Sequence, residues 1–180
     1  MKLKILILIL VLQCAWLLGT VAVQERALAS GKGIRLETWP VDPNDPLRGD
    51  YLLLNYKISD VPQNLFSPPV KKDLSAGQVV YVALEPRGEF YEVARAGTDW
   101  FAPSANQILL KGKSSWRPWN SKTNVTHVEY GLERFYVAEG MGHPHGKLAA
   151  HVVVSASGNA SLKQVFVGGK PYAEAREDSE

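Results

Sequence analysis

A run of 20 consecutive residues without a charge, from Ile5 to Gln24, constrains this chain more than any other feature. Most of these residues are Leu, Ile or Val. At about 1.5 Å per residue, a helix of this length spans the roughly 30 Å hydrocarbon core of a bilayer. Lys2 and Lys4 precede the run, and basic flanking residues favour the cytoplasmic side. The sequence therefore predicts a single-pass protein of the cell membrane, with a cytoplasmic N-terminus and an extracytoplasmic (periplasmic) C-terminal domain.

Two interpretations of the apolar run compete. A cleaved signal peptide has a short apolar core followed by a site of small residues, and both Ala27-Leu28-Ala29 and Thr20-Val21-Ala22 have that form. However, Glu25 and Arg26 separate the run from the first of these sites, and the run is longer than most signal cores. We favour an uncleaved signal-anchor. On either interpretation, residues 31–180 are exported.

The charges and the single cysteine exclude several classes of protein. Residues 1–30 contain three of the 20 basic residues and one of the 18 acidic ones, so the rest of the chain carries 17 of each sign. A neutral exported part argues against a nucleic-acid binder. One cysteine, Cys14, cannot form a disulfide within the chain. A charged fraction of 21%, with 5 Trp, 7 Tyr and 5 Phe, is that of a chain with a folded domain and not of a disordered chain.

Beyond the apolar run, the pattern is that of short strands separated by turns rich in proline and glycine. In 50–59, for example, Leu54, Tyr56 and Ile58 alternate with polar or half-exposed positions. A hairpin is expected where Glu85-Pro-Arg-Gly88 closes two such strands, and a short helix is expected within 131–140. The other expected strands are 34–39, 78–84, 89–94, 107–112, 124–130, 148–156 and 160–167.

This pattern predicts a mainly β fold, an antiparallel sandwich or partly open barrel preceded by one transmembrane helix. We expect a signal-anchor in 1–26, a juxtamembrane stalk in 27–33, one exported β-domain in 34–173 and an acidic tail in 174–180.

Three groups of residues are candidates for chemistry. His143 and His145 are one residue apart and are weak candidates for a metal site, with His151 or Glu139 as a further ligand. Without a fixed spacing to further ligands, a solvated loop is the favoured interpretation. Glu129, Glu133 and Glu139 form an acidic cluster, which an ion-pair network that orders the fold also explains.

Three tryptophans, Trp100, Trp116 and Trp119, would form a stacking platform for sugars if exposed and part of the core if buried. No nucleophile motif is present, and Ser115, Ser121 or Ser155 would need a partner base that the sequence does not reveal. The sequence predicts no cofactor and does not support an enzyme.

Two sequence blocks resemble a known family. The first reads GDYLLLNY and follows Arg48; its positions are Gly49, Asp50, Tyr51, Leu54 and Tyr56. The second reads YGLERFYVAEG; its positions include Tyr130, Gly131, Glu133, Arg134, Glu139 and Gly140. In this order and after an apolar span, the blocks resemble those of the GDYXXLXY family of bacterial membrane-anchored proteins. Ala138 stands where that family usually has proline.

The resemblance implies no catalytic or binding residues, because the family has no established activity. It implies an integral-membrane partner, since the family's genes commonly lie beside genes for multi-pass membrane proteins. We expect the two blocks to meet, with Leu54 and Tyr56 in the core and Gly49, Asp50, Glu133 and Arg134 in a polar corner.

The leading hypothesis is thus an accessory or interaction module of a membrane complex, held in the bilayer through residues 5–24. The alternatives are an envelope hydrolase or metal-dependent enzyme, and a glycan-binding domain.

Overall fold

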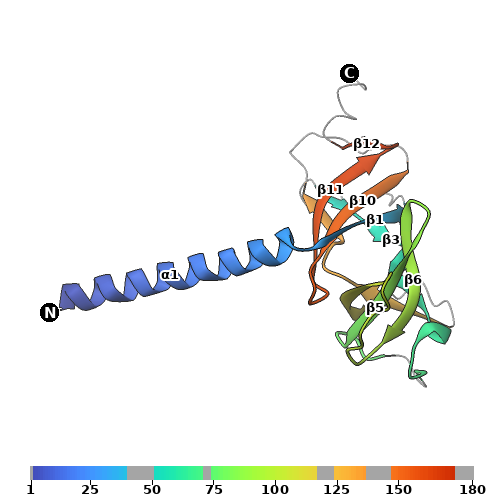
Figure 1. Cartoon of the computed structure of the whole chain (residues 1–180), viewed down its shortest axis with the longest axis horizontal. Coiled ribbons are helices and arrows are strands. Elements are labelled where there is room, and N and C mark those ends of the chain that lie inside the picture. Colours follow the sequence, from blue (N-terminus) through green and yellow to red (C-terminus); the bar gives the residue numbers. More distant parts are fainter. Residues whose placement is uncertain (1, 40–50, 71–73, 117–123, 137–146, 173–180) are drawn as a thin grey trace.

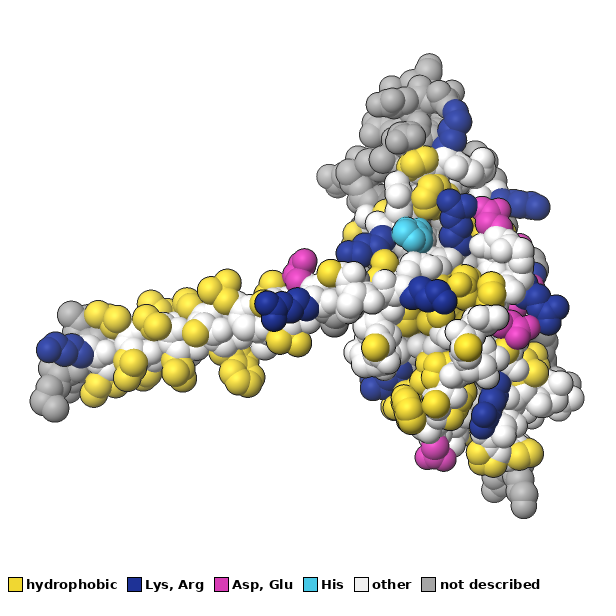
Figure 2. Space-filling model, in the orientation of Figure 1, with side chains coloured by type: hydrophobic (Ala, Val, Ile, Leu, Met, Phe, Trp, Pro, Cys, Tyr) yellow, Lys and Arg dark blue, Asp and Glu magenta, His cyan; other side chains and the backbone are white. Residues whose placement is uncertain are grey.

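The N-terminal helix α1 extends away from the β-domain as a single rod (Figure 1). α1 covers Lys2–Ala29, and its segment Lys4–Val23 has a mean hydropathy of 2.5 with none of it buried against the rest of the chain. Figure 2 shows hydrophobic side chains along both edges of the helix, and the large hydrophobic residues from Ile5 to Val23 are all exposed, as in a membrane span and unlike an amphipathic surface helix. The helix is long and apolar enough to cross a membrane. The computed structural model describes residues 2–39, 51–70, 74–116, 124–136 and 147–172.

One five-stranded antiparallel sheet, the β1 sheet, continues directly from α1 (Figure 1). Its strand order is β12-β11-β10-β1-β3. These strands are β1 (Lys32–Trp39), β3 (Asn55–Tyr56), β10 (Leu148–Val154), β11 (Ala160–Val167) and β12 (Lys170–Pro171). Only Ser30 and Gly31 separate α1 from β1, so the segment expected as a stalk is largely helix end and strand start.

The second five-stranded antiparallel sheet, the β5 sheet, has the order β4-β8-β7-β5-β6. Its strands are β4 (Asp60–Pro62), β5 (Val79–Arg87), β6 (Phe90–Gly97), β7 (Ile108–Ser115) and β8 (Val125–Glu129). A separate two-stranded ribbon, which we call the motif ribbon, consists of β2 (Tyr51–Leu53) and β9 (Arg134–Tyr136). Two short 3₁₀ turns, η1 (Lys57–Ser59) and η2 (Gln63–Leu65), flank β4.

The core lies between the two large sheets. Successive strand residues point to opposite faces, so each strand contributes alternate side chains to it. Ile34 and Leu36 of β1 and Val80 and Val82 of β5 belong to the same buried cluster. The predicted mainly β fold with antiparallel sheets is therefore confirmed.

The single strand that we predicted over 50–59 is wrong. This segment contains β2, β3 and η1, and its two strands belong to different sheets; β4, in a third sheet, begins directly after it at Asp60. The segment follows β9 as far as Leu54, whose amide donates to the Glu133 carbonyl at 2.8 Å, and from Asn55 it pairs with β1 instead. The alternation nevertheless persists, since Leu54, Tyr56 and Ile58 are all buried.

Two local predictions also need correction. The β5–β6 hairpin forms, but Glu85 and Pro86 remain in its ladder, paired with Glu92 and Tyr91, and the turn lies at Gly88. Proline is tolerated there because β5 has already passed its last pairing with β7, at Leu84. The expected helix in 131–140 is wrong for the described part, where β9 forms instead, because these residues pair with β2.

Candidate functional site

The two sequence blocks meet at one place, which we call the motif junction: residues 51–58 and 130–136. In the motif ribbon, Leu53 pairs with Arg134 and Tyr51 pairs with Tyr136. The Leu54 amide extends this contact by donating to the Glu133 carbonyl. Segments almost 80 positions apart in the sequence are thus joined by backbone hydrogen bonds.

Two buried tyrosines lock the motif junction by reciprocal hydrogen bonds. The Tyr56 hydroxyl donates to the Leu132 carbonyl at 2.8 Å, and the Tyr130 hydroxyl donates to the Ile58 carbonyl at 2.8 Å. Tyr56 is 1% exposed and Tyr130 is 7% exposed, so neither hydroxyl has water as an alternative partner. Buried phenols of this kind need protein acceptors. Each of the two segments of the motif junction therefore donates a tyrosine hydrogen bond to a main-chain carbonyl of the other.

Glu133 supports the turn between these bonds. Its carboxylate accepts a hydrogen bond from the Tyr130 amide at 2.5 Å, and Gly131 between them adopts a left-handed φ of +78°. Burial, and next the negative charge of Glu133, raise the pKa of both Tyr56 and Tyr130 above its ordinary value. The phenols therefore stay protonated at neutral pH, and the arrangement is suited to holding backbone and not to acid–base catalysis.

The outward side of the motif junction is accessible. Leu53 is 46% exposed, Tyr136 is 75% exposed and Arg134 is exposed. Large apolar side chains flanking a cation form a surface that suits contact with another molecule. The structure thus divides the described motif residues into an inward set that packs and an outward set that is available for binding.

The model of the GDYXXLXY protein family matches residues 13–165. The chain belongs to this family. No curated protein and no solved structure matches the chain. The match includes every residue of the motif junction, as well as the second half of the apolar helix.

Several predicted site residues of this GDYXXLXY protein lie outside the described residues, so the structure does not place them. They are Arg48, Gly49, Asp50, Glu139, Gly140, His143 and His145. Among the described residues, no group of three or more His, Cys, Asp or Glu side chains is arranged to hold a metal ion. His151 is on β10 in the β1 sheet, whereas Glu133 is at the motif junction.

Sequence reasoning missed a row of polar residues across the β5 sheet. Asp60 pairs with His127, and His127 pairs with Ser115 on its other side, so the three side chains share one face. His127 Nδ1 lies 2.9 Å from Asp60 Oδ1, and its buried Nε2 has no hydrogen-bond partner among the described residues. Among the described residues, no hydrogen bond joins His127 to Ser115. The row there thus lacks the serine–histidine hydrogen bond of a catalytic triad.

Gly112 is a second residue that sequence reasoning missed. A Cβ at this position in β7 would lie 2.5 Å from Val128 Cγ1 and 2.9 Å from Tyr130 Cδ1. The absence of a side chain is what allows Tyr130 to pack against the β5 sheet. A glycine inside an expected strand was the available signal, because such a residue often marks a close approach.

Two of the three candidate tryptophans are exposed, Trp100 by 62% and Trp116 by 76%; Trp119 lies outside the described residues. Trp100 follows β6 and Trp116 follows β7. Both strands pair antiparallel with β5, so they run in the same direction and end at the same end of the sheet. Within the sheet, two strand spacings of about 10 Å in total separate β6 from β7.

Proposed function

We propose that this GDYXXLXY protein is a single-pass membrane protein whose extracytoplasmic β-domain is an accessory or interaction module of a membrane complex. The observation that carries the proposal is the uncovered helix. Lys4–Val23 is apolar and none of it is buried by the β-domain, so lipid or another membrane protein must cover it. The basic residues before this segment favour a cytoplasmic N-terminus.

The motif ribbon supports an interaction role for the β-domain. Its inward residues hold the fold, whereas Leu53 and Tyr136 expose apolar surface beside Arg134. Exposed aromatic and apolar groups next to arginine are typical of protein interfaces. We assign the partner as a multi-pass membrane protein, and its contacts as α1, the motif ribbon, or both.

In-cell crosslinking of the full chain, followed by membrane purification and mass spectrometry, tests the partner. Three variants locate the contact: a chain with a foreign membrane span, the double variant Leu53→Ser/Tyr136→Ser, and Trp100→Ser as a matched control. We expect a specific multi-pass protein that is retained by the control and lost from at least one of the first two. Absence of any specific partner from the unaltered chain would overturn the accessory role.

Membrane topology is tested separately. Alkaline phosphatase fused to the C-terminus is active only outside the cytoplasm, whereas green fluorescent protein exported in unfolded form is dark there. We expect an active phosphatase fusion and a dark fluorescent fusion, with the mass of the intact chain showing no loss of residues 1–29. The reverse pair of activities would contradict the proposed orientation.

Glycan binding is a second candidate, which the exposure of Trp100 and Trp116 at one end of the β5 sheet favours. A glycan array probed with the full chain tests it. Binding that is lost in both Trp100→Ala and Trp116→Ala would support this role, and an array without binding would remove it.

A further inference from the structure

The apolar span of α1 carries a polar side chain that no described residue satisfies. Gln13 is the tenth of the 20 residues Lys4–Val23, so it lies at the middle of the span. Its side chain is exposed and makes no hydrogen bond with the described residues. Thr20, the other residue of the span with an amide or hydroxyl side chain, differs, because its hydroxyl donates to the Leu17 carbonyl at 2.8 Å. Gln13 therefore brings two N–H donors and a carbonyl acceptor to the centre of the bilayer.

An amide at this depth is satisfied only by another polar group inside the bilayer. Moving an amide out of water without a hydrogen bond is unfavourable, and lipid tails offer neither donor nor acceptor. The middle of the hydrocarbon core is about 15 Å from either interface, which a glutamine side chain does not reach. Glutamine in a membrane helix instead forms hydrogen bonds to a neighbouring helix.

Gln13 belongs to one continuous face of α1, which we call the Gln13 face. Its members follow one another at spacings of four, three, four and three residues: Leu6, Leu10, Gln13, Leu17 and Thr20. This spacing is the a/d pattern of two helices that pack side by side. A single polar residue at such a position fixes the register of the pair.

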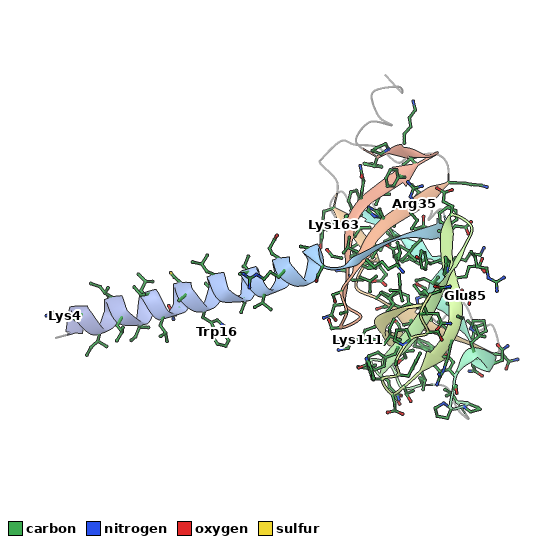
Figure 3. The ribbon with its side chains drawn as sticks, viewed as in Figure 1. Lys4, Trp16, Arg35, Glu85, Lys111 and Lys163 are labelled. Atoms are coloured by element: carbon green, nitrogen blue, oxygen red, sulfur yellow. The ribbon has the colours of Figure 1, made fainter. Side chains whose placement is uncertain are left out.

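The Gln13 face is open along most of its length. Of its five residues, only Thr20 borders the hollow between α1 and the β-domain. The hollow is also bordered by Trp16, Gly19 and Val23, which are turned from Gln13 by about 60–120° around the helix axis. Figure 3 shows that α1 between Lys4 and Trp16 has no other described element beside it. A second helix can therefore pack along this face.

A second copy of this chain meets the requirement of Gln13 at the correct depth. Copies inserted in the same orientation are parallel, so Gln13 of one copy is level with Gln13 of the other. A primary amide is both donor and acceptor, so two glutamines can each donate to the carbonyl oxygen of the other. Such a pair is symmetric, as in most homodimers.

We propose that this GDYXXLXY protein forms a parallel homodimer in the membrane through the Gln13 face, with the two Gln13 amides hydrogen-bonded to each other. Leu10 and Leu17, about one helix turn on either side of Gln13, pack against their equivalents. The inference rests on the proposed anchoring of α1. It goes beyond the multi-pass partner, whose contact it leaves to the motif ribbon, and it brings two β-domains into one complex.

Cysteine crosslinking of the full chain in phosphatidylcholine vesicles tests the face. In a Cys14→Ser background, single cysteines replace Leu10 or Leu17 on the Gln13 face, or Leu8 or Leu18 on the opposite side of α1. All four leucines are between 59% and 70% exposed. We expect oxidation with copper phenanthroline to give disulfide dimers from Leu10→Cys and Leu17→Cys, and few from the other two. Equal yields from both sides, or no dimer from either, would overturn the inference.

Sedimentation equilibrium of the full chain in density-matched detergent micelles measures what the amide contributes. Gln13→Leu should weaken self-association about 5–30-fold, the strength of polar side-chain hydrogen bonds between helices in model membrane peptides. Gln13→Asn keeps an amide and should retain most of the association. Val11→Leu is the matched control, since it also introduces leucine but outside the Gln13 face, and should change nothing. A Gln13→Leu variant that associates as strongly as this control contradicts the proposed pairing.

Extraction with alkaline carbonate reports anchoring independently. A chain that stays in the vesicles without dimerising removes only the pairing, whereas a chain released by carbonate removes the anchoring on which the pairing rests. Crosslinking in cells from Leu10→Cys to a multi-pass protein, with no dimer of this chain, would assign the Gln13 face to that protein and also overturn the homodimer.

Discussion

Removing a single hydroxyl from the motif junction should destabilise the β-domain measurably. In Tyr56→Phe, the ring still fills its buried site, but the Leu132 carbonyl loses the donor that lies 2.8 Å away. Leu132 is 3% exposed, so water cannot replace that donor without opening the core. A buried acceptor left without a partner costs about 1–3 kcal/mol. For a domain of this size, that corresponds to a melting temperature lower by about 3–10 °C.

Urea and thermal unfolding of the full chain in detergent micelles, followed by tryptophan fluorescence, would measure this loss. Tyr81→Phe is the matched control, since Tyr81 makes no hydrogen bond with the described residues and should change stability by less than about 0.5 kcal/mol. Tyr130→Phe should lose a similar amount to Tyr56→Phe. The double variant should lose less than the sum, because both bonds join the same two segments. A Tyr56→Phe variant as stable as the Tyr81→Phe control would refute the reasoning.

Three further predictions concern the β-domain. In the folded state, the pKa values of Tyr56 and Tyr130 are raised above the unfolded value of 10.0. Their contribution to the unfolding free energy is therefore complete below about pH 10 and is lost as the pH rises further. Unfolding measured at pH 9 to 11 should show this loss, and the double variant Tyr56→Phe/Tyr130→Phe should not show it. Gly112→Ala should lower stability by about 1–3 kcal/mol through contact with Val128 and the main chain, whereas Gly33→Ala meets only the movable ring of His151 and should cost less; chemical denaturation compares them. Asp60→Ala should cost about 1–3 kcal/mol, because it leaves the His127 ring, which is 9% exposed, without its partner; the melting temperature checks it.

Local pattern was sufficient to predict elements whose strands are neighbours in the sequence. The strand expected at 160–167 has these bounds in the structure, and it pairs with β10, the preceding strand in the sequence. Such hairpins depend on alternation and on turn residues, which are both visible in one stretch of chain. The apolar helix could also be predicted from the uncharged run, because length and composition alone define a helix able to span a bilayer.

The same pattern failed where distant partners decide the backbone. Alternation in 50–59 fits one strand, but its first residues pair with β9 and the following ones, Asn55 and Tyr56, pair with β1. The expected helix in 131–140 failed for the same reason, since β9 exists only through its pairing with β2. The polar row of Asp60, His127 and Ser115 has no local sequence signal at all, because its members come together only through strand order.

The reciprocal tyrosine bonds give a physical reason for a tyrosine at each of two positions of the motif junction. An apolar core position tolerates several residues of similar volume. A buried position whose aromatic ring must also place a hydroxyl on a given carbonyl tolerates only tyrosine. Tyr56 and Tyr130 each meet that requirement, and Glu133 and Gly131 set the turn that presents the Leu132 carbonyl. These buried hydrogen bonds fix the motif ribbon from its inner side. The side chains on its outward face are therefore not needed for the core and can contact another molecule.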